Sequence, residues 1–236
     1  MRLDKFLANN TSLSRKEVSK QIKLGNVSID DKIANSNEQK IDENVNKIYL
    51  CGKLILYSKY IYIMLNKPLG VVSATTDKNQ KTVLDLLPTE YKKYNLFPCG
   101  RLDKDTLGLV ILTNNGQGAH KLLSPKNHIE KTYEFECAEP LTETSKQKIE
   151  HGIELRDGYL TKPCKILLTN STKGKITLTE GKYHEIKRML GAVGNKITFL
   201  KRVSFGNIVL DNNLNSGEYR LLTKQEQLIF EEDKNC

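Results

Sequence analysis

Residues 99–116 have the sequence CGRLDKDTLGLVILTNNG, a charged turn that runs directly into a strongly apolar segment. The apolar part, residues 108–113, predicts a buried strand. Asp103 lies between basic neighbours that would keep its carboxylate ionised, so it could act as a nucleophile or an electrostatic partner. By chemistry alone a salt-bridged turn remains the commoner explanation, and Asp105, two residues further on, is a second candidate.

The sequence on both sides of this turn alternates between strands and short helices. Strands are predicted at residues 61–66, 108–113 and 131–138, and helices at residues 81–87, 142–152 and 184–194. The lengths and order favour an α+β domain that begins near residue 60, and they do not favour a regular βαβ repeat.

Two of these segments carry further candidate residues. On a helix, His184, Lys187 and Arg188 stand at positions i, i+3 and i+4, so their side chains would share one face that could grip phosphates. Tyr133, on a predicted strand, offers a flat ring and a phenol, although a tyrosine in a strand is usually a packing residue. Four scattered histidines form no metal-binding pattern, so no metal site is assigned.

The N-terminal segment predicts a helix, a second helix and a strand. Apolar residues recur at helical spacing in residues 2–9 and 14–24, and Ser14 with Glu17 forms a capping-box pattern. Val27 and Ile29 alternate with polar residues, as in a short strand. Residues 1–25 hold six basic and two acidic side chains, a surplus of +4. Such a pair of helices can lie against RNA phosphates, although an ordinary solvated surface explains the charge equally well.

Composition narrows the class of protein. The 236 residues carry a net charge of +9, with 38% hydrophobic and 28% charged residues, which predicts a folded protein with a basic surface. Its five cysteines are far apart, so reduced thiols in the cytoplasm are expected rather than disulfides. No secretion signal or membrane-spanning run is present, and no heptad pattern indicates self-association, so a cytoplasmic monomer is expected.

Residues 2–30, RLDKFLANNTSLSRKEVSKQIKLGNVSID, closely resemble the S4 RNA-binding domain, and the resemblance extends over nearly all of residues 1–50. It implies that this part of the chain binds RNA. The basic side chains it places in contact with RNA are Arg2, Lys5, Arg15, Lys16 and Lys20.

Four segments further along resemble the pseudouridine synthases in sequence, order and spacing. They are NKPLGVVSA (66–74), GRLDKDTLGLVILTNNG (100–116), EKTYEFE (130–136) and EGKYHEIKRML (180–190). The S4 domain in front places the chain with the members that modify ribosomal RNA. This resemblance implies an S4 domain at 1–50, a linker at 51–59 and, at 60–236, a catalytic domain built on a mixed, mainly antiparallel sheet.

The resemblance also implies roles for individual residues. Asp103 matches the catalytic aspartate, Arg101 a residue that contacts RNA near the target, and Tyr133 the tyrosine that stacks on the target base. Lys187 stands where many members have an arginine paired with the aspartate; it lacks the bidentate fork but can keep Asp103 ionised. His184 and Arg188 are expected to contact RNA. Neither a cofactor nor a catalytic metal is implied.

The implied reaction converts one uridine, turned out of its helix, into pseudouridine. The implied substrate is 16S rRNA, either free or in a small-subunit assembly intermediate. A 23S rRNA enzyme of the same family would share all four segments, so it stays an alternative. A noncatalytic S4-type assembly factor is a third possibility, but it predicts a degraded GRLD turn, which is intact here. A glycoside hydrolase would need two opposed acids, and nothing pairs Asp105 with Asp103 in that way.

Overall fold

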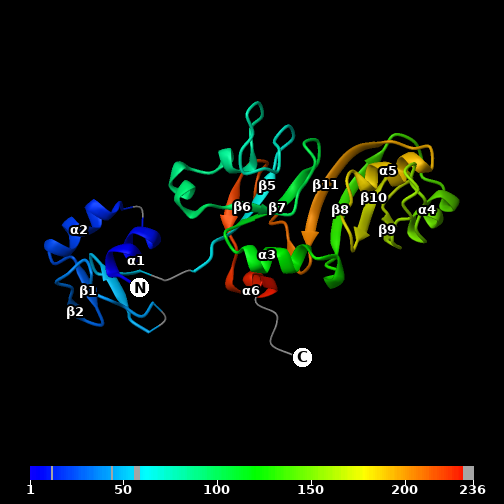
Figure 1. Ribbon diagram of the computed structural model, residues 1–236. Coiled ribbons are helices and arrows are strands. Elements are labelled where there is room, and N and C mark those ends of the chain that lie inside the picture. Colours follow the sequence, from blue (N-terminus) through cyan, green and yellow to red (C-terminus); the bar gives the residue numbers. More distant parts are fainter. Residues whose placement is uncertain (12, 44, 56–58, 231–236) are drawn as a thin grey trace. The chain divides into compact units, whose positions relative to one another are not determined.

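The computed structural model describes residues 1–11, 13–43, 45–55 and 59–230 (Figure 1). The chain forms two compact units. One consists of residues 1–60 together with 89–95, and the other of residues 61–88 together with the remainder from 96 onward.

The first unit is a pair of helices with a small antiparallel sheet. The helices are α1 (Leu3–Asn10) and α2 (Arg15–Lys23). The strands are β1 (Val27–Ile29), β2 (Lys32–Ile33), β3 (Ile48–Leu50) and β4 (Lys53–Ile55), in the order β2-β1-β3-β4. The predicted capping box is present, because Ser14 and Glu17 exchange hydrogen bonds at the start of α2. The short 3-10 helix η2 (Thr89–Tyr94) belongs to this unit.

The core of this unit lies between the helices and the sheet. It includes the predicted apolar positions of both helices, such as Phe6 and Val18, and the strand residue Val27. Leu24, counted above as part of the apolar pattern, is 60% exposed because it caps the end of α2 rather than facing inward. Within the stretch 51–59, expected as a linker, residues 53–55 form β4, which pairs with β3. Its residues 56–58 lie outside the described residues.

The second unit is built on one large sheet. Its strands are β5 (Tyr62–Lys67), β6 (Phe97–Cys99), β7 (Leu107–Thr113), β8 (Lys131–Cys137), β9 (Lys165–Leu168), β10 (Lys173–Leu178), β11 (Ile197–Phe205), β12 (Ile208–Val209) and β13 (Tyr219–Leu221). The main path is β13-β5-β7-β11-β8-β10-β9, with β6 on β7 and β12 on β11. Only the β7–β11 pair is parallel among these strands, so the expected α+β class with a mixed, mainly antiparallel sheet is confirmed.

Burial explains why the central strands were the clearest in the sequence. Every residue of β5, and all but the first of β7, is buried. Strands that are covered on both faces have nearly continuous apolar sequences, which are easy to identify. β8 alternates between buried and half-buried residues. In Figure 1 the long strand β11 runs between β7 and β8.

Short helices lie between and after the strands of this sheet. They are α3 (Gly116–Leu123), α4 (Glu143–Glu150), α5 (Glu185–Ala192) and α6 (Lys224–Gln227), with 3-10 helices η1 (Val83–Leu86), η3 (Pro125–Asn127) and η4 (Leu228–Phe230). The segment 81–87 forms only η1, because Pro88 disfavours a helical conformation at Leu87. Within the described residues no helix is long and apolar enough to cross a membrane.

Candidate active site

The turn before β7 has a backbone that requires glycine at both ends. Gly100 and Gly108 have φ angles of +81° and +97°. A Cβ atom at Gly108 would lie 2.2 Å from the carbonyl oxygen of Arg202, at the point where β7 pairs with β11. Only glycine therefore allows the turn to enter the sheet here.

Two side chains from residues 67–73 fix the backbone of this turn by hydrogen bonds. The side chain of Lys67 is fully buried, and its Nζ donates to the carbonyl oxygens of Thr106 at 2.8 Å, Pro68 at 3.1 Å and Lys104 at 3.2 Å. Burial lowers the pKa of Lys67 to about 8, against the opposing effect of two nearby aspartates. Ser73 adds a reciprocal pair of hydrogen bonds with the backbone of Leu102.

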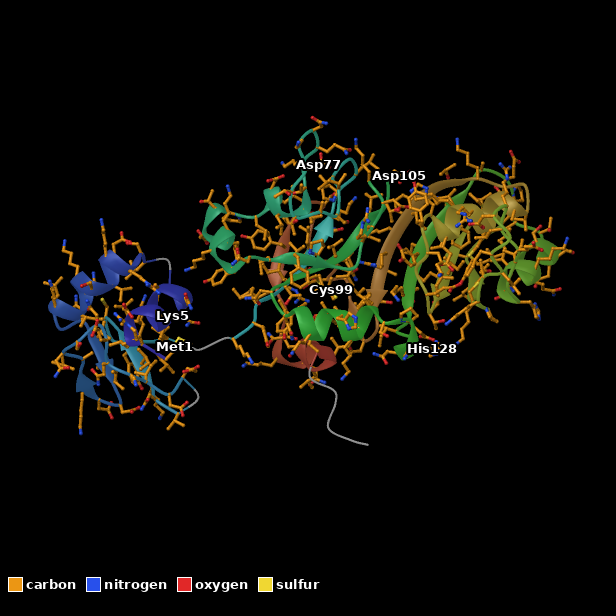
Figure 2. All side chains as sticks on the ribbon, in the orientation of Figure 1. Met1, Lys5, Asp77, Cys99, Asp105 and His128 are labelled. Atoms are coloured by element: carbon orange, nitrogen blue, oxygen red, sulfur yellow. The ribbon has the colours of Figure 1, made fainter. Side chains whose placement is uncertain are left out.

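The turn presents its two carboxylates differently. The side chain of Asp103 is 27% exposed; its Oδ2 lies 2.9 Å from Nζ of Lys187 and its Oδ1 3.5 Å from Nε2 of His184. Asp105 is 66% exposed and shares the same lysine at 2.5 Å. Figure 2 labels Asp105, which lies just before the start of the central strand β7. The hydrogen bond from Lys187 holds the pKa of Asp105 below its usual range.

Lys187 is therefore the cation that joins the turn to α5. Partial burial acts to lower the pKa of Lys187, but the hydrogen bonds to Asp105 and Asp103 outweigh it and raise the pKa. The lysine stays charged near neutral pH and can compensate the charge of Asp103.

The structure corrects the expectation of one basic helical face. His184 lies outside the helix: α5 begins at Glu185, and His184 is its N-cap in a left-handed conformation with φ of +50°. It reaches Asp103 from the loop and stacks on Tyr183, with ring centroids 3.8 Å apart. Arg188 is in the helix but forms an ion pair with Asp157 at 2.5 Å instead of pointing to Asp103.

A pocket brings the remaining predicted residues of this unit together. Asp103, Arg101, Tyr133 and His184 all line it. Tyr133 is buried on β8, whereas Arg101 is exposed. A wider hollow of about 910 Å³ adjoins the pocket and is lined by the same turn, by residues 69–74 and by Tyr183.

The basic residues predicted to contact RNA in the first unit differ in their surroundings. Lys5, Arg15, Lys16 and Lys20 are exposed on α1 and α2. Arg2 is different, since it pairs with Asp4 at 3.0 Å and Glu38 at 3.3 Å. Among the described residues no group of three or more histidine, cysteine or acidic side chains could hold a metal ion.

Sequence reasoning missed two residues beneath the loop that carries His184. Glu180 and Glu185 are 7% and 5% exposed, and their carboxyl groups lie next to each other. Glutamate is common in the first turn of a helix, so the sequence carried no sign that Glu185 would be buried.

The basic helices of the first unit and the pocket of Asp103 beside Lys187 in the second fit an enzyme that acts on RNA, and comparison with known proteins makes the class specific. Residues 61–192 match the RNA pseudouridylate synthase family, and residues 1–46 match the S4 domain. The chain is a member of the S4-containing RNA pseudouridine synthases, which are isomerases.

Individual relatives cover nearly the whole chain. An "Uncharacterized RNA pseudouridine synthase" of Bacillus subtilis is 45% identical over 98% of this chain and 99% of its own. The ribosomal small subunit pseudouridine synthase A of Vibrio cholerae is 40% identical over 96% and 97%, and that of Escherichia coli is 38% identical over 96% and 98%. A crystal structure of a pseudouridylate synthase aligns with a TM-score of 0.69 and 38% identity, over 98% of this chain and 99% of the other.

Proposed function

We propose that this protein converts one uridine of 16S rRNA, free or within an assembling small subunit, into pseudouridine, with Asp103 as the catalytic carboxylate. The observation that carries the proposal is the placement of Asp103 in a pocket beside Tyr133, between Lys187 and His184. The choice of small-subunit rRNA is supported by the names of relatives about 40% identical over nearly their full length.

The reaction sets the demands on this pocket. The bond from ribose C1′ to N1 of uracil breaks, the base rotates, and C1′ bonds to C5. N1 gains a proton and C5 loses one, so substrate and product are isomers. The target nucleotide has to leave its helix to be reached, and the detached base has to be retained.

Each side chain of the site answers one of these demands. The carboxylate of Asp103 either attacks the nucleotide or removes a ribose proton, and Lys187 places a positive charge beside it. The ring of Tyr133 stacks on the base, which retains it during rotation. Arg101, exposed at the mouth of the pocket, contacts the RNA beside the target; His184 and Arg188 are further contacts.

The N-terminal unit adds affinity rather than chemistry. In this proposal residues 1–50 act as the S4 domain, residues 60–236 as the catalytic domain, and the two units act on one RNA. The exposed cations Lys5, Arg15, Lys16 and Lys20, with Arg2, contact phosphates. A cytoplasmic location follows from a substrate that is made and assembled there.

The test is tritium release from transcripts labelled at uridine C5. The protein is incubated with 16S and with 23S rRNA, each alone and as a partly assembled particle, and the product position is mapped by carbodiimide modification and primer extension. Release from small-subunit RNA at one position supports the proposal. Release from 23S rRNA alone would mean that the protein carries out the same reaction on large-subunit rRNA. No release from any of these substrates would favour a noncatalytic binding factor.

A further inference from the structure

The loop that carries His184 is closed by two acidic residues. Glu180 precedes the loop and Glu185 begins α5, and their carboxyl groups lie next to each other, so a hydrogen bond between them would join the two ends of the loop. Gly181, Lys182, His184 and Glu185 line the pocket of Asp103. Whatever holds the two carboxyl groups together therefore also shapes one wall of the pocket.

The oxygen atoms of this pair are unequally supplied with donors. Glu180 accepts from the hydroxyl of Tyr159 at 2.6 Å and from the backbone N–H of Lys162 at 2.9 Å. Glu185 accepts through Oε2 from the backbone N–H of Lys182 at 2.8 Å. Its other oxygen, Oε1, is buried and has no donor.

A proton on Glu185 resolves both difficulties. Two ionised carboxylates in contact and out of water would repel strongly, and an orphaned buried oxygen is costly. If Oε1 carries a proton, it donates to Glu180, and Glu180 remains a carboxylate with three donors. The acid falls on Glu185 because Glu180 already has two donors of its own.

We propose that Glu185 is a positioning residue: a neutral carboxylic acid near pH 7 that shares its proton with Glu180 and so holds loop 180–185 against the pocket of Asp103. The inference deepens the proposed function, since its activity readout rests on catalysis in that pocket. His184, held in a left-handed conformation that is uncommon for residues other than glycine, is the side chain this loop delivers to Asp103.

The surroundings of the pair agree with a neutral acid. Burial first, and then the hydrogen bond with Glu180, raise the pKa of Glu185 to about 8. The titratable groups that face it from the surrounding elements are Glu180, Lys182, Tyr159, Lys131 and Cys164. Lys182 reduces this rise in the pKa without cancelling it. Above that pKa both carboxyl groups are ionised and repel each other, so the loop loses its tie.

The test compares the wild type with Glu185→Gln, whose amide can accept from Lys182 and donate to Glu180 but does not titrate. Tritium release gives kcat/KM at pH 7 and pH 9. The kcat/KM of the wild type divided by that of the variant is expected to fall about tenfold from pH 7 to pH 9, because a carboxylic acid with a pKa of about 8 ionises over this range. Lys67 and the uridine itself titrate in both reactions and cancel from the ratio.

A matched control is Glu154→Gln, which makes the same chemical change at an exposed glutamate outside the pocket. Its ratio to wild type is expected to stay constant with pH. A constant ratio for Glu185→Gln as well would overturn the positioning role.

A second readout needs neither RNA nor activity. In protein labelled with ¹³C at glutamate side-chain carboxyls, one resonance is expected to titrate near pH 8 and to be missing from Glu185→Gln. If every glutamate titrates in the ordinary range, the acid pair does not exist. A protein inactive on all RNAs would defeat the proposed function, while this titration would still decide whether the pair exists.

Discussion

Two loops meet at Asp103, and they are fixed in opposite ways. The turn before β7 is tied by an ammonium group, that of Lys67, which donates to three backbone carbonyls. The loop before α5 is tied by a pair of acids, Glu180 and Glu185. A buried polar group can thus hold a loop by donating hydrogen bonds to backbone carbonyls or by sharing one proton between two side chains. Only the first loop supplies the reacting carboxylate.

The largest difference in activity between two substitutions is expected within the first loop, at Asp103 and Asp105. Asp103→Asn should lower tritium release on the order of a thousandfold, because an amide can neither attack nor accept the proton. Asp105→Asn should cost less than about tenfold, since Asp105 is mostly exposed and does not line the pocket that holds Asp103 and Tyr133. Equal losses in the two variants would mean that the assignment of the catalytic carboxylate is wrong.

Removing the tie of the first loop should act on folding. Lys67→Met keeps the volume but leaves three carbonyl oxygens without this donor, so the free energy of unfolding is expected to fall by about 2–4 kcal/mol. Urea unfolding followed by circular dichroism measures it. Lys78→Met, at an exposed lysine on the loop after β5, is the control and should change stability by less than about 0.5 kcal/mol.

The link between the loops is the next target. Lys187→Gln removes the cation beside Asp103 and is expected to lower kcat by about ten- to a hundredfold, whereas Lys187→Arg should retain most activity because a guanidinium can contact both carboxylates. Steady-state tritium release separates the two. Full activity in Lys187→Gln would show that Asp103 does not need this partner.

The first loop was predictable because its charged residues stand close together in the sequence, directly before an apolar strand. Asp103 and Lys187 could be paired in advance only through the family resemblance, since 84 residues separate them and they meet through β7, β11 and α5. The central strands were clear because both faces are buried. The second loop was not predictable: the left-handed turn at His184 and the burial of Glu185 accompany contacts between distant segments, such as those of Glu180 with Tyr159 and Lys162, and the periodicity of the sequence indicates neither.

The smallest effect is expected far from both loops. Lys16→Gln on α2 removes one exposed cation, so RNA affinity should fall by a few-fold and the slope of log affinity against log salt should decrease by about one. Filter binding over a salt series measures both. An unchanged slope would remove Lys16 from the RNA-contacting surface.

The role of Asp103 in making a pseudouridine in small-subunit rRNA can be tested in living cells by mapping the pseudouridines of their rRNA. In cells that lack this gene, we expect one position in 16S rRNA to be unmodified. Wild-type protein should restore the modification, and Asp103→Asn, expressed to the same level, should not. Restoration by Asp103→Asn, or a change confined to 23S rRNA, would show that Asp103 does not have this role.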